Sequence, residues 1–360
     1  MLFLKGVEVA ARRVFLAGLT RLAAGGNSTA PDWDARPHRV LFLRHDRIGD
    51  MVVSTAMLHV IKRAHANVEL HVLASPLNAP VVAHDPAVQT VVPFNRHSLR
   101  DYARLLGHFR RTRYDVVVDP MVFNQSLTTL LLILATRAPH RVGVLKPGRP
   151  NVYTMFAIPH DHHGDPRRDH MLEYLAQLAI PFGVAPSDAT RMTLVVTDAE
   201  RALARKQWEV GRRLLVNVSA GEELRRWPDD RYVAIVRHLL ERVPGARVLV
   251  LHGPADRARA DVIARRAGVE RADTASLRSA MALVAEAEFV FTPDTSIVHI
   301  AGALDVPTVA LFTFDEVDRW RPQARINRVA VGLGLTMESV SLDDARRAVD
   351  EVLTETHLVN

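Results

Sequence analysis

Cysteine is absent from this chain of 360 residues, so neither a disulfide framework nor a thiolate metal site can form. That absence fits a reducing compartment, and we expect a cytoplasmic protein. Long apolar runs are also missing, because none reaches the roughly 18–20 residues that cross a bilayer. No G-x-G-x-x-G follows a predicted strand and no G-x-x-x-x-G-K-[ST] occurs, so dinucleotide redox chemistry and P-loop nucleotide hydrolysis lose their main support.

The charge balance is basic, with a formal net charge of +6 carried mainly by arginine. Such a balance favours polyanionic partners: nucleic acid, an anionic membrane surface or phosphorylated substrates. The chain has no lysine-rich tail, zinc-finger spacing or aromatic RNA-binding signature. Nucleic acid is therefore the weakest of the three, and we expect none as a partner.

Length and hydrophobicity indicate two globular domains, because a domain takes about 150 residues and 48% of this chain is hydrophobic. Short apolar runs alternate with helical patterns, which predicts parallel, doubly wound α/β sheets. Two such Rossmann-like domains would face each other across a cleft. The predicted limits are an extension and linker at 1–36, a first domain at 37–185, a second domain at 186–335 and a C-terminal helix at 336–360.

The periodicity also gives element positions. Predicted strands are 39–44, 68–73, 88–92, 114–118, 142–144, 214–218, 247–251, 289–291 and 308–312. Predicted helices are 51–65, 100–110, 127–136, 169–178, 230–242, 255–267, 276–285 and 341–354. The last one begins with a capping box made by Ser341 and Asp344.

The first 25 residues interleave apolar side chains with Lys5, Arg12, Arg13 and Arg21. One interpretation is a basic amphipathic helix that rests on anionic lipid, at the inner face of the cytoplasmic membrane. The other is a helix packed on the domain, or a misassigned start codon. A cleaved signal peptide is disfavoured, because Arg12 and Arg13 interrupt the apolar segment.

The first candidate site is L-R-H-D-R-I-G-D, which ends at Asp50. Gly49 permits a tight strand-to-helix turn there. Asp50 could simply be a helix N-cap, a position that Asp favours. Alternatively, Arg44 and Arg47 would hold its carboxylate ionised and able to act as a base, and would attract an acidic acceptor.

The second candidate site is V-S-A-G-E-E-L-R-R-W-P, from residue 218 to 228. The small-residue turn after Ser219 lets the backbone approach a phosphate, and Arg225 could neutralise it with two hydrogen bonds. The structural alternative places Pro228 at a helix start with Trp227 packed beneath it. Gly253 ends another strand and could pass close to a nucleotide, although Gly-Pro is common in any loop.

The third candidate site is the turn P-D-T-S between two buried strands. A helix that starts there points free N–H groups and its positive dipole end out of the sheet edge. Asp294, Thr295, Ser296 and His299 would line this anion site with further side chains. The alternative is a capping cluster with a core histidine at position 299.

Two other clusters resemble metal sites but give weaker evidence of function. His160, Asp161, His162, His163 and Asp165 resemble metal ligands, but no regular element fixes their spacing, so we predict no metal site. The run Asp32-Trp33-Asp34 resembles the acidic pair of metal-dependent sugar transferases. Because it lies in the linker and not after a strand, we interpret it as solvated.

Taken together, the three candidate sites resemble the heptosyltransferases of glycosyltransferase family 9, from about Arg39 to the C-terminal helix. The family's R-x-x-x-x-G-D followed by small hydroxyl residues is matched by residues 44–50 with Ser54 and Thr55. Its K-x-W-P is matched by residues 225–228. Its D-[ST]-G-x-x-H-x-A-x-A-L-x-x-P is matched by residues 294–307.

This resemblance implies a GT-B architecture, with the acceptor site in the first domain and the nucleotide-sugar site in the second. It implies an inverting, metal-independent transfer of heptose from ADP-heptose to a lipopolysaccharide core or related glycan, without a cofactor. The aspartate that matches Asp50 would be the general base. Arg225 and the helix start at Thr295 and Ser296 would stabilise the leaving diphosphate.

Acceptor residues are expected among the arginines of the first domain: Arg44, Arg47 and Arg141. Two departures concern the donor half, since Arg225 replaces the family's lysine and Ser296 replaces its glycine. Two alternatives therefore stay open. One is a GT-B transferase that uses another nucleotide sugar, and the other is a non-catalytic nucleotide-sugar or polyanion-binding protein of the same fold.

Overall fold

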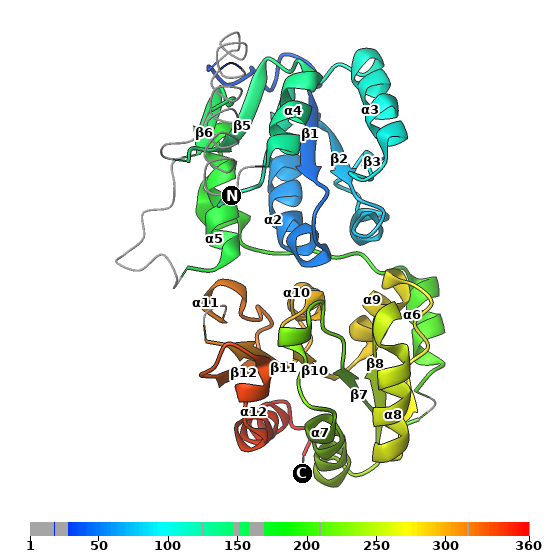
Figure 1. Cartoon of the computed structure of the whole chain (residues 1–360). Coiled ribbons are helices and arrows are strands. Elements are labelled where there is room, and N and C mark those ends of the chain that lie inside the picture. The colour runs from blue at the N-terminus through cyan, green and yellow to red at the C-terminus, as the bar shows by residue number, and fades with distance from the viewer. Residues whose placement is uncertain are drawn as a thin grey trace, which may run out of the picture.

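The protein is described here by a computed structural model that covers residues 28–123, 126–146, 151–157, 169–208, 210–314 and 317–359, together with Gly18. Within these residues the chain forms two six-stranded sheets, one in each domain, as Figure 1 shows. All strand pairs in both sheets are parallel. The predicted α/β class with two doubly wound domains is confirmed. No helix in this part of the chain is long and apolar enough to cross a membrane.

The first sheet has the strand order β3-β2-β1-β4-β5-β6. Its strands are β1 (Arg39–Arg44), β2 (Glu69–Ala74), β3 (Thr90–Pro93), β4 (Val116–Val118), β5 (His140–Val144) and β6 (Met155–Ala157). Alternate residues of β1 face opposite sides. Val40 and Phe42 pack with α2 (Ile48–Ala64) and α5 (Met171–Ala176). Leu41 and Leu43 pack with α3 (Leu99–Arg111) and α4 (Leu127–Thr136).

The second sheet repeats this order as β9-β8-β7-β10-β11-β12. Its strands are β7 (Arg212–Asn217), β8 (Ala246–Leu251), β9 (Glu270–Arg271), β10 (Phe289–Pro293), β11 (Thr308–Thr313) and β12 (Asn327–Gly332). One face is covered by α7 (Asp229–Arg242), α8 (Arg257–Ala267) and α12 (Leu342–Glu355). The other face carries α6 (Asp198–Arg205), α9 (Leu277–Glu286) and α10 (Ser296–Ala303).

The two domains meet through α2 of the first and α10 of the second, which pack against each other (Figure 1). One apolar cluster is continuous between them, with Met57 on one side and Ile300 on the other. Polar contacts also cross this boundary. Arg278 donates to the carbonyl of Pro80 at 3.3 Å, and His170 Nε2 lies 3.1 Å from the carbonyl of Arg321. The domains therefore present one joint surface around α2 and α10.

Most predicted elements are present with shifts of a few residues at their ends, and two results differ from expectation. The strands β6, β9 and β12 and the helices α6 and α11 (Val317–Trp320) were not predicted. The predicted helix at 169–178 is an α-helix only over Met171–Ala176 and continues as a 3₁₀ helix over Gln177–Phe182. Ser341 does cap α12, accepting a hydrogen bond from the backbone of Asp344. The domain limits at residues 36, 185 and 335 stay predictions.

Candidate active site

Each sheet reverses its strand order once, between β1 and β4 in the first domain and between β7 and β10 in the second. Ligands of doubly wound sheets bind outside the carboxyl ends of the strands at such reversals. All three candidate sites from the sequence follow strands that border a reversal: residues 44–50 follow β1, 218–228 follow β7 and 293–299 follow β10. Two independent halves of a site are thus defined by topology.

The packing of α2 against α10 brings the first and third candidate sites into contact. Gly49, in the first turn of α2, lies against the ring of His299 on α10. A Cβ added at residue 49 would lie 2.8 Å from His299 Cδ2. Real Cβ atoms do not approach other atoms this closely, so only glycine fits here without a shift. Asp50 is consequently next to the point where the two domains touch.

Asp50 is the third residue of α2, because Arg47 occupies the N-cap position. The interpretation of Asp50 as a helix N-cap is therefore wrong. The side chain is about one-fifth exposed, and its Oδ1 lies 3.7 Å from Arg44 Nη1. Burial raises the pKa of Asp50, the charges of Arg44 and Arg47 lower it, and Asp46 raises it, with a net rise. A carboxylate with a raised pKa is a stronger base than a solvated one.

Arg44 is 3% exposed, and its guanidinium makes its hydrogen bonds within the protein. Its Nε donates to Ser54 at 2.8 Å, and its Nη1 donates to Asp46 at 2.9 Å. Burial disfavours the charged guanidinium, but Asp46, Asp50 and Asp119 outweigh burial and raise the pKa of Arg44. Arg44 is thus a fixed buried charge beside Asp50, held by its neighbours rather than extended into solvent.

The second half of the site centres on an ion pair across the β7–β10 reversal. Arg225 Nη1 lies 2.5 Å from Asp294 Oδ2, which joins the second and third candidate sites. Ser219 accepts a hydrogen bond from the backbone of Gly253, so the ends of β7 and β8 are also joined. Seven residues proposed from the sequence for donor binding therefore lie at one sheet edge: Ser219, Arg225, Gly253, Asp294, Thr295, Ser296 and His299.

Thr295 and Ser296 begin α10. Thr295 is the N-cap, and its hydroxyl accepts a hydrogen bond from the backbone of Ile297 at 3.3 Å. Ser296 is the first residue of the helix. The remaining orphan N–H groups and the positive end of the helix dipole lie at the sheet edge beside Asp294 and Arg225. The predicted strand–turn–helix geometry of this candidate site is present.

His299 is buried, and its Nδ1 has no hydrogen-bond partner among the described residues. Burial lowers its pKa to about 4, so the imidazole is neutral at neutral pH. Its ring also contacts Trp320, with ring centroids 5.4 Å apart. A buried nitrogen without a partner costs free energy, so a ligand atom that reached Nδ1 and donated a hydrogen bond to it would offset that cost.

The other two arginines that were proposed for the acceptor lie elsewhere. Arg47 is exposed, and its Nη2 lies 3.6 Å from Glu222 of the second domain. Arg141 lies in β5, where its Nε donates to the carbonyl of Val152 at 2.6 Å and its Nη1 to that of Ala138 at 3.2 Å. The structure does not bring Arg141 together with Asp50.

Only one of the two metal-like clusters from the sequence, Asp32-Trp33-Asp34, lies in the described part of the chain. Residues 160–165 lie outside the described part of the chain. Asp32 and Asp34 are exposed, as the solvated interpretation expects. Trp33 between them is not solvated, because its ring stacks on His65 with centroids 4.5 Å apart. Among the described residues no group of three or more His, Asp or Glu side chains could hold a metal ion.

Three residues at these edges were missed by sequence reasoning. Asn217 ends β7 and donates to Thr292 at 2.9 Å and to Thr295 at 3.1 Å. Asp119 directly follows β4, is 1% exposed and accepts a hydrogen bond of 2.6 Å from Tyr153. A single polar residue that ends an apolar strand was the available signal in both cases, whereas Tyr153 has no signal in the sequence.

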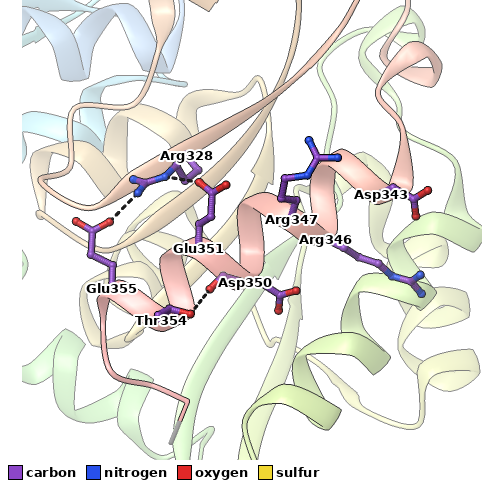
Figure 2. A pocket seen from close by; sticks show the side chains of 8 residues that line it. All are labelled: Arg328, Asp343, Arg346, Arg347, Asp350, Glu351, Thr354 and Glu355. Atoms are coloured by element: carbon purple, nitrogen blue, oxygen red, sulfur yellow. Dashed lines mark hydrogen bonds and ion pairs between the residues drawn. The ribbon is translucent and has the colours of Figure 1, made fainter.

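A surface hollow of about 670 Å³ lies far from this site, between α12 and β12 (Figure 2). Its charged side chains largely neutralise each other. Arg328 pairs with Glu351 at 2.7 Å and with Glu355 at 2.9 Å. Because the hollow lies at neither strand reversal, we assign the candidate active site to the sheet edges.

The fold and the site define a glycosyltransferase of the GT-B type, with two Rossmann-like domains whose strand reversals are brought together. The chain belongs to glycosyltransferase family 9 (heptosyltransferase), whose model matches residues 102–342. It is 24% identical over 318 residues to lipopolysaccharide heptosyltransferase 2 of Salmonella typhimurium, covering 82% of this chain and 89% of that protein.

Solved structures share the fold. The glycosyl transferase family 9 protein from Veillonella parvula has a TM-score of 0.77 at 14% identity, with 91% of this chain and 99% of that chain covered. The E. coli ADP-heptose lps heptosyltransferase II has a TM-score of 0.72 at 20% identity, with 89% and 99% covered. The predicted GT-B architecture and family are thereby confirmed.

Proposed function

We propose that the protein transfers heptose from ADP-heptose to a lipopolysaccharide core or a related surface glycan, on the cytoplasmic side of the membrane. The names of the relatives support the donor and the acceptor class. The observation that carries the proposal is the contact of Gly49 with His299, because it places Asp50 beside the α10 end of the second domain. The proposed base and the proposed anion site would then lie close together.

In the proposed mechanism Asp50 removes the proton from an acceptor hydroxyl. The freed oxygen attacks the anomeric carbon from the side opposite the diphosphate, so the configuration at that carbon inverts. As the bond to the leaving oxygen breaks, negative charge grows on the diphosphate. We assign its stabilisation to Arg225 and to the N–H groups at Thr295 and Ser296, acting without a metal ion.

The remaining donor residues have supporting roles in this proposal. Ser219 and Gly253, joined by their hydrogen bond, line the nucleotide. Asp294 holds Arg225 in place through the 2.5 Å ion pair. The neutral His299 offers its free Nδ1 to the donor. For the acceptor, Arg47 is exposed at the domain boundary and suits an acidic sugar, and Arg141 stays a weaker proposal.

For Arg44 we propose a positioning role in place of acceptor binding, because its hydrogen bonds are made within the protein. Its charge lowers the pKa of Asp50 against the effect of burial. The base works only when deprotonated, so activity is lost as pH falls through this pKa. In Arg44→Gln the pKa of Asp50 should rise. The acidic limb of the pH profile of kcat/KM should then move to higher pH by about one unit or more.

Two further variants test this role. Arg44→Lys keeps the charge and should keep the limb close to that of the wild type. Arg47→Gln should move the limb in the same direction by less, because Arg47 is exposed and also lowers the pKa of Asp50. A merely structural role for Arg44 would reduce activity equally at every pH, with the limb unmoved.

The proposed function as a whole is tested with a donor panel. Calorimetry and transfer assays with ADP-, GDP-, UDP- and TDP-sugars should single out ADP-heptose. Turnover of another donor would favour a different nucleotide sugar, which the replacements at Arg225 and Ser296 make the second candidate. Donor binding without turnover on any glycan acceptor would favour a binding protein. A chelator should leave transfer unchanged, and strong inhibition would contradict the metal-free mechanism.

A further inference from the structure

The arginines of this chain are unevenly distributed. The 18 residues from Arg96 to Arg113, which comprise α3 and its flanking turns, hold six arginines against one aspartate, a net charge of +5. The whole chain has a net charge of +6. We refer to the exposed side chains of residues 96–113 as the α3 surface.

Arginines elsewhere in the protein are commonly paired with carboxylates, as Arg328 is with Glu351 and Glu355 in Figure 2. On the α3 surface Arg104 pairs with Asp101 at 3.1 Å. The other five arginines are exposed and have no carboxylate partner among the described residues: Arg96, Arg100, Arg110, Arg111 and Arg113. Unneutralised positive charge of this density is typical of a surface that binds a polyanion.

Helical spacing arranges this surface in stripes. Leu105 and Phe109 face the core and are buried. Leu99 and Leu106, seven residues apart, lie on one outer stripe and are 86% and 44% exposed. Arg100 and Arg111 follow the neighbouring stripe, together with Arg104, which pairs with Asp101. Aliphatic side chains beside unpaired arginines suit the interface of an anionic bilayer, where the leucines enter the acyl boundary and the arginines meet the headgroups.

The α3 surface lies on the outer flank of the first domain, away from the second domain (Figure 1). Its first residue, Arg96, is near His45, which is next to Arg44: burial lowers the pKa of His45, and the charge of Arg96 lowers it further. His45 also contacts Phe94, with ring centroids 5.3 Å apart. The surface therefore runs from the rim of the acceptor half along the side of the domain.

We propose that the α3 surface docks the first domain on an anionic phospholipid bilayer, with the acceptor half of the site at the membrane boundary. The suggested purpose of this contact, to bring the site to its acceptor, rests on the proposed function. The binding of the α3 surface to a bilayer does not. It is also separate from any contribution of residues 1–25. Binding can thus be measured without transfer, and failure of one proposal leaves the other standing.

The test uses the full chain and sedimentation with phosphatidylcholine vesicles, with and without phosphatidylglycerol. The triple variant Arg100→Gln, Arg110→Gln, Arg111→Gln removes three charges from the α3 surface. Each basic side chain near an anionic surface contributes about five-fold, so affinity for the anionic vesicles should fall on the order of 100-fold. The matched control is Arg237→Gln, Arg265→Gln, Arg347→Gln, which removes three exposed charges from α7, α8 and α12.

The control should bind like the wild type, and phosphatidylcholine alone should bind none of the proteins. Equal affinity of the triple variant and the control for anionic vesicles would overturn the proposal. Leu99→Ser with Leu106→Ser should weaken vesicle binding further but leave binding to duplex DNA unchanged. If these serines have no effect on vesicles and DNA binds more tightly through the same arginines, the partner is nucleic acid and the membrane proposal is wrong.

Discussion

Asp50→Asn should lower kcat about 1000-fold while donor affinity stays within about two-fold of the wild type. The size follows from the usual contribution of a general base, about 100- to 10,000-fold. Asparagine has nearly the same shape and keeps the packing beside Gly49, but its amide cannot accept the acceptor's proton. The measurements are transfer at saturating donor and acceptor, and donor titration by calorimetry.

The control is Asp34→Asn, which removes an exposed carboxylate from the linker and should have no effect. Transfer by Asp50→Asn at the wild-type rate would refute the assignment of the base. If donor affinity fell as steeply as kcat, Asp50 would belong to donor binding instead.

Arg225→Gln should lower kcat/KM about 100- to 1000-fold, because a preorganised cation at the developing diphosphate charge contributes that much. The loss should fall mainly on kcat if Arg225 acts on the leaving group, since charge there is greatest in the transition state. The variant also leaves Asp294 without the 2.5 Å partner described above, so thermal stability is measured in parallel.

Arg225→Lys restores the residue type of the family and should recover much of the lost activity, with a change in geometry. Arg265→Gln, an equal loss of charge on the exposed side of α8, should be silent. An unchanged kcat with a raised KM in Arg225→Gln would show that Arg225 binds donor and transition state equally.

The sequence predicts the central strands well because burial on both faces leaves an apolar signal. Strand β1 is found at 39–44 as predicted, and five of its six residues are buried. Edge strands lack this signal, and β12 was missed because four of its six residues are only partly buried. Strand β9 spans only two residues, which is too short for any periodicity. The helix α6 is short and mostly exposed, so its capping residue Thr197 was its main signal.

The same contrast holds for the candidate site. Residues 44–50, 219–225 and 294–299 are predictable because each follows a strong strand with a polar turn. Their partners are not, because the hydrogen bonds from Tyr153 to Asp119 and from Asn217 to Thr295 join residues 34 and 78 positions apart. The role of Arg44 is hidden for another reason. Arginine is nearly always exposed, which favoured an acceptor-binding role for Arg44, but this residue is only 3% exposed.

The contact of Gly49 with the ring of His299 limits how closely the two domains can approach each other. The two helices cannot approach further at this point, and a larger side chain at residue 49 would hold them apart. We therefore expect the separation between the proposed base on α2 and the proposed anion site on α10 to be set by this contact before any substrate binds. If the proposed sites are correct, we expect Gly49 to influence which donor sugar fits between them, although this residue has no side chain to contact the sugar.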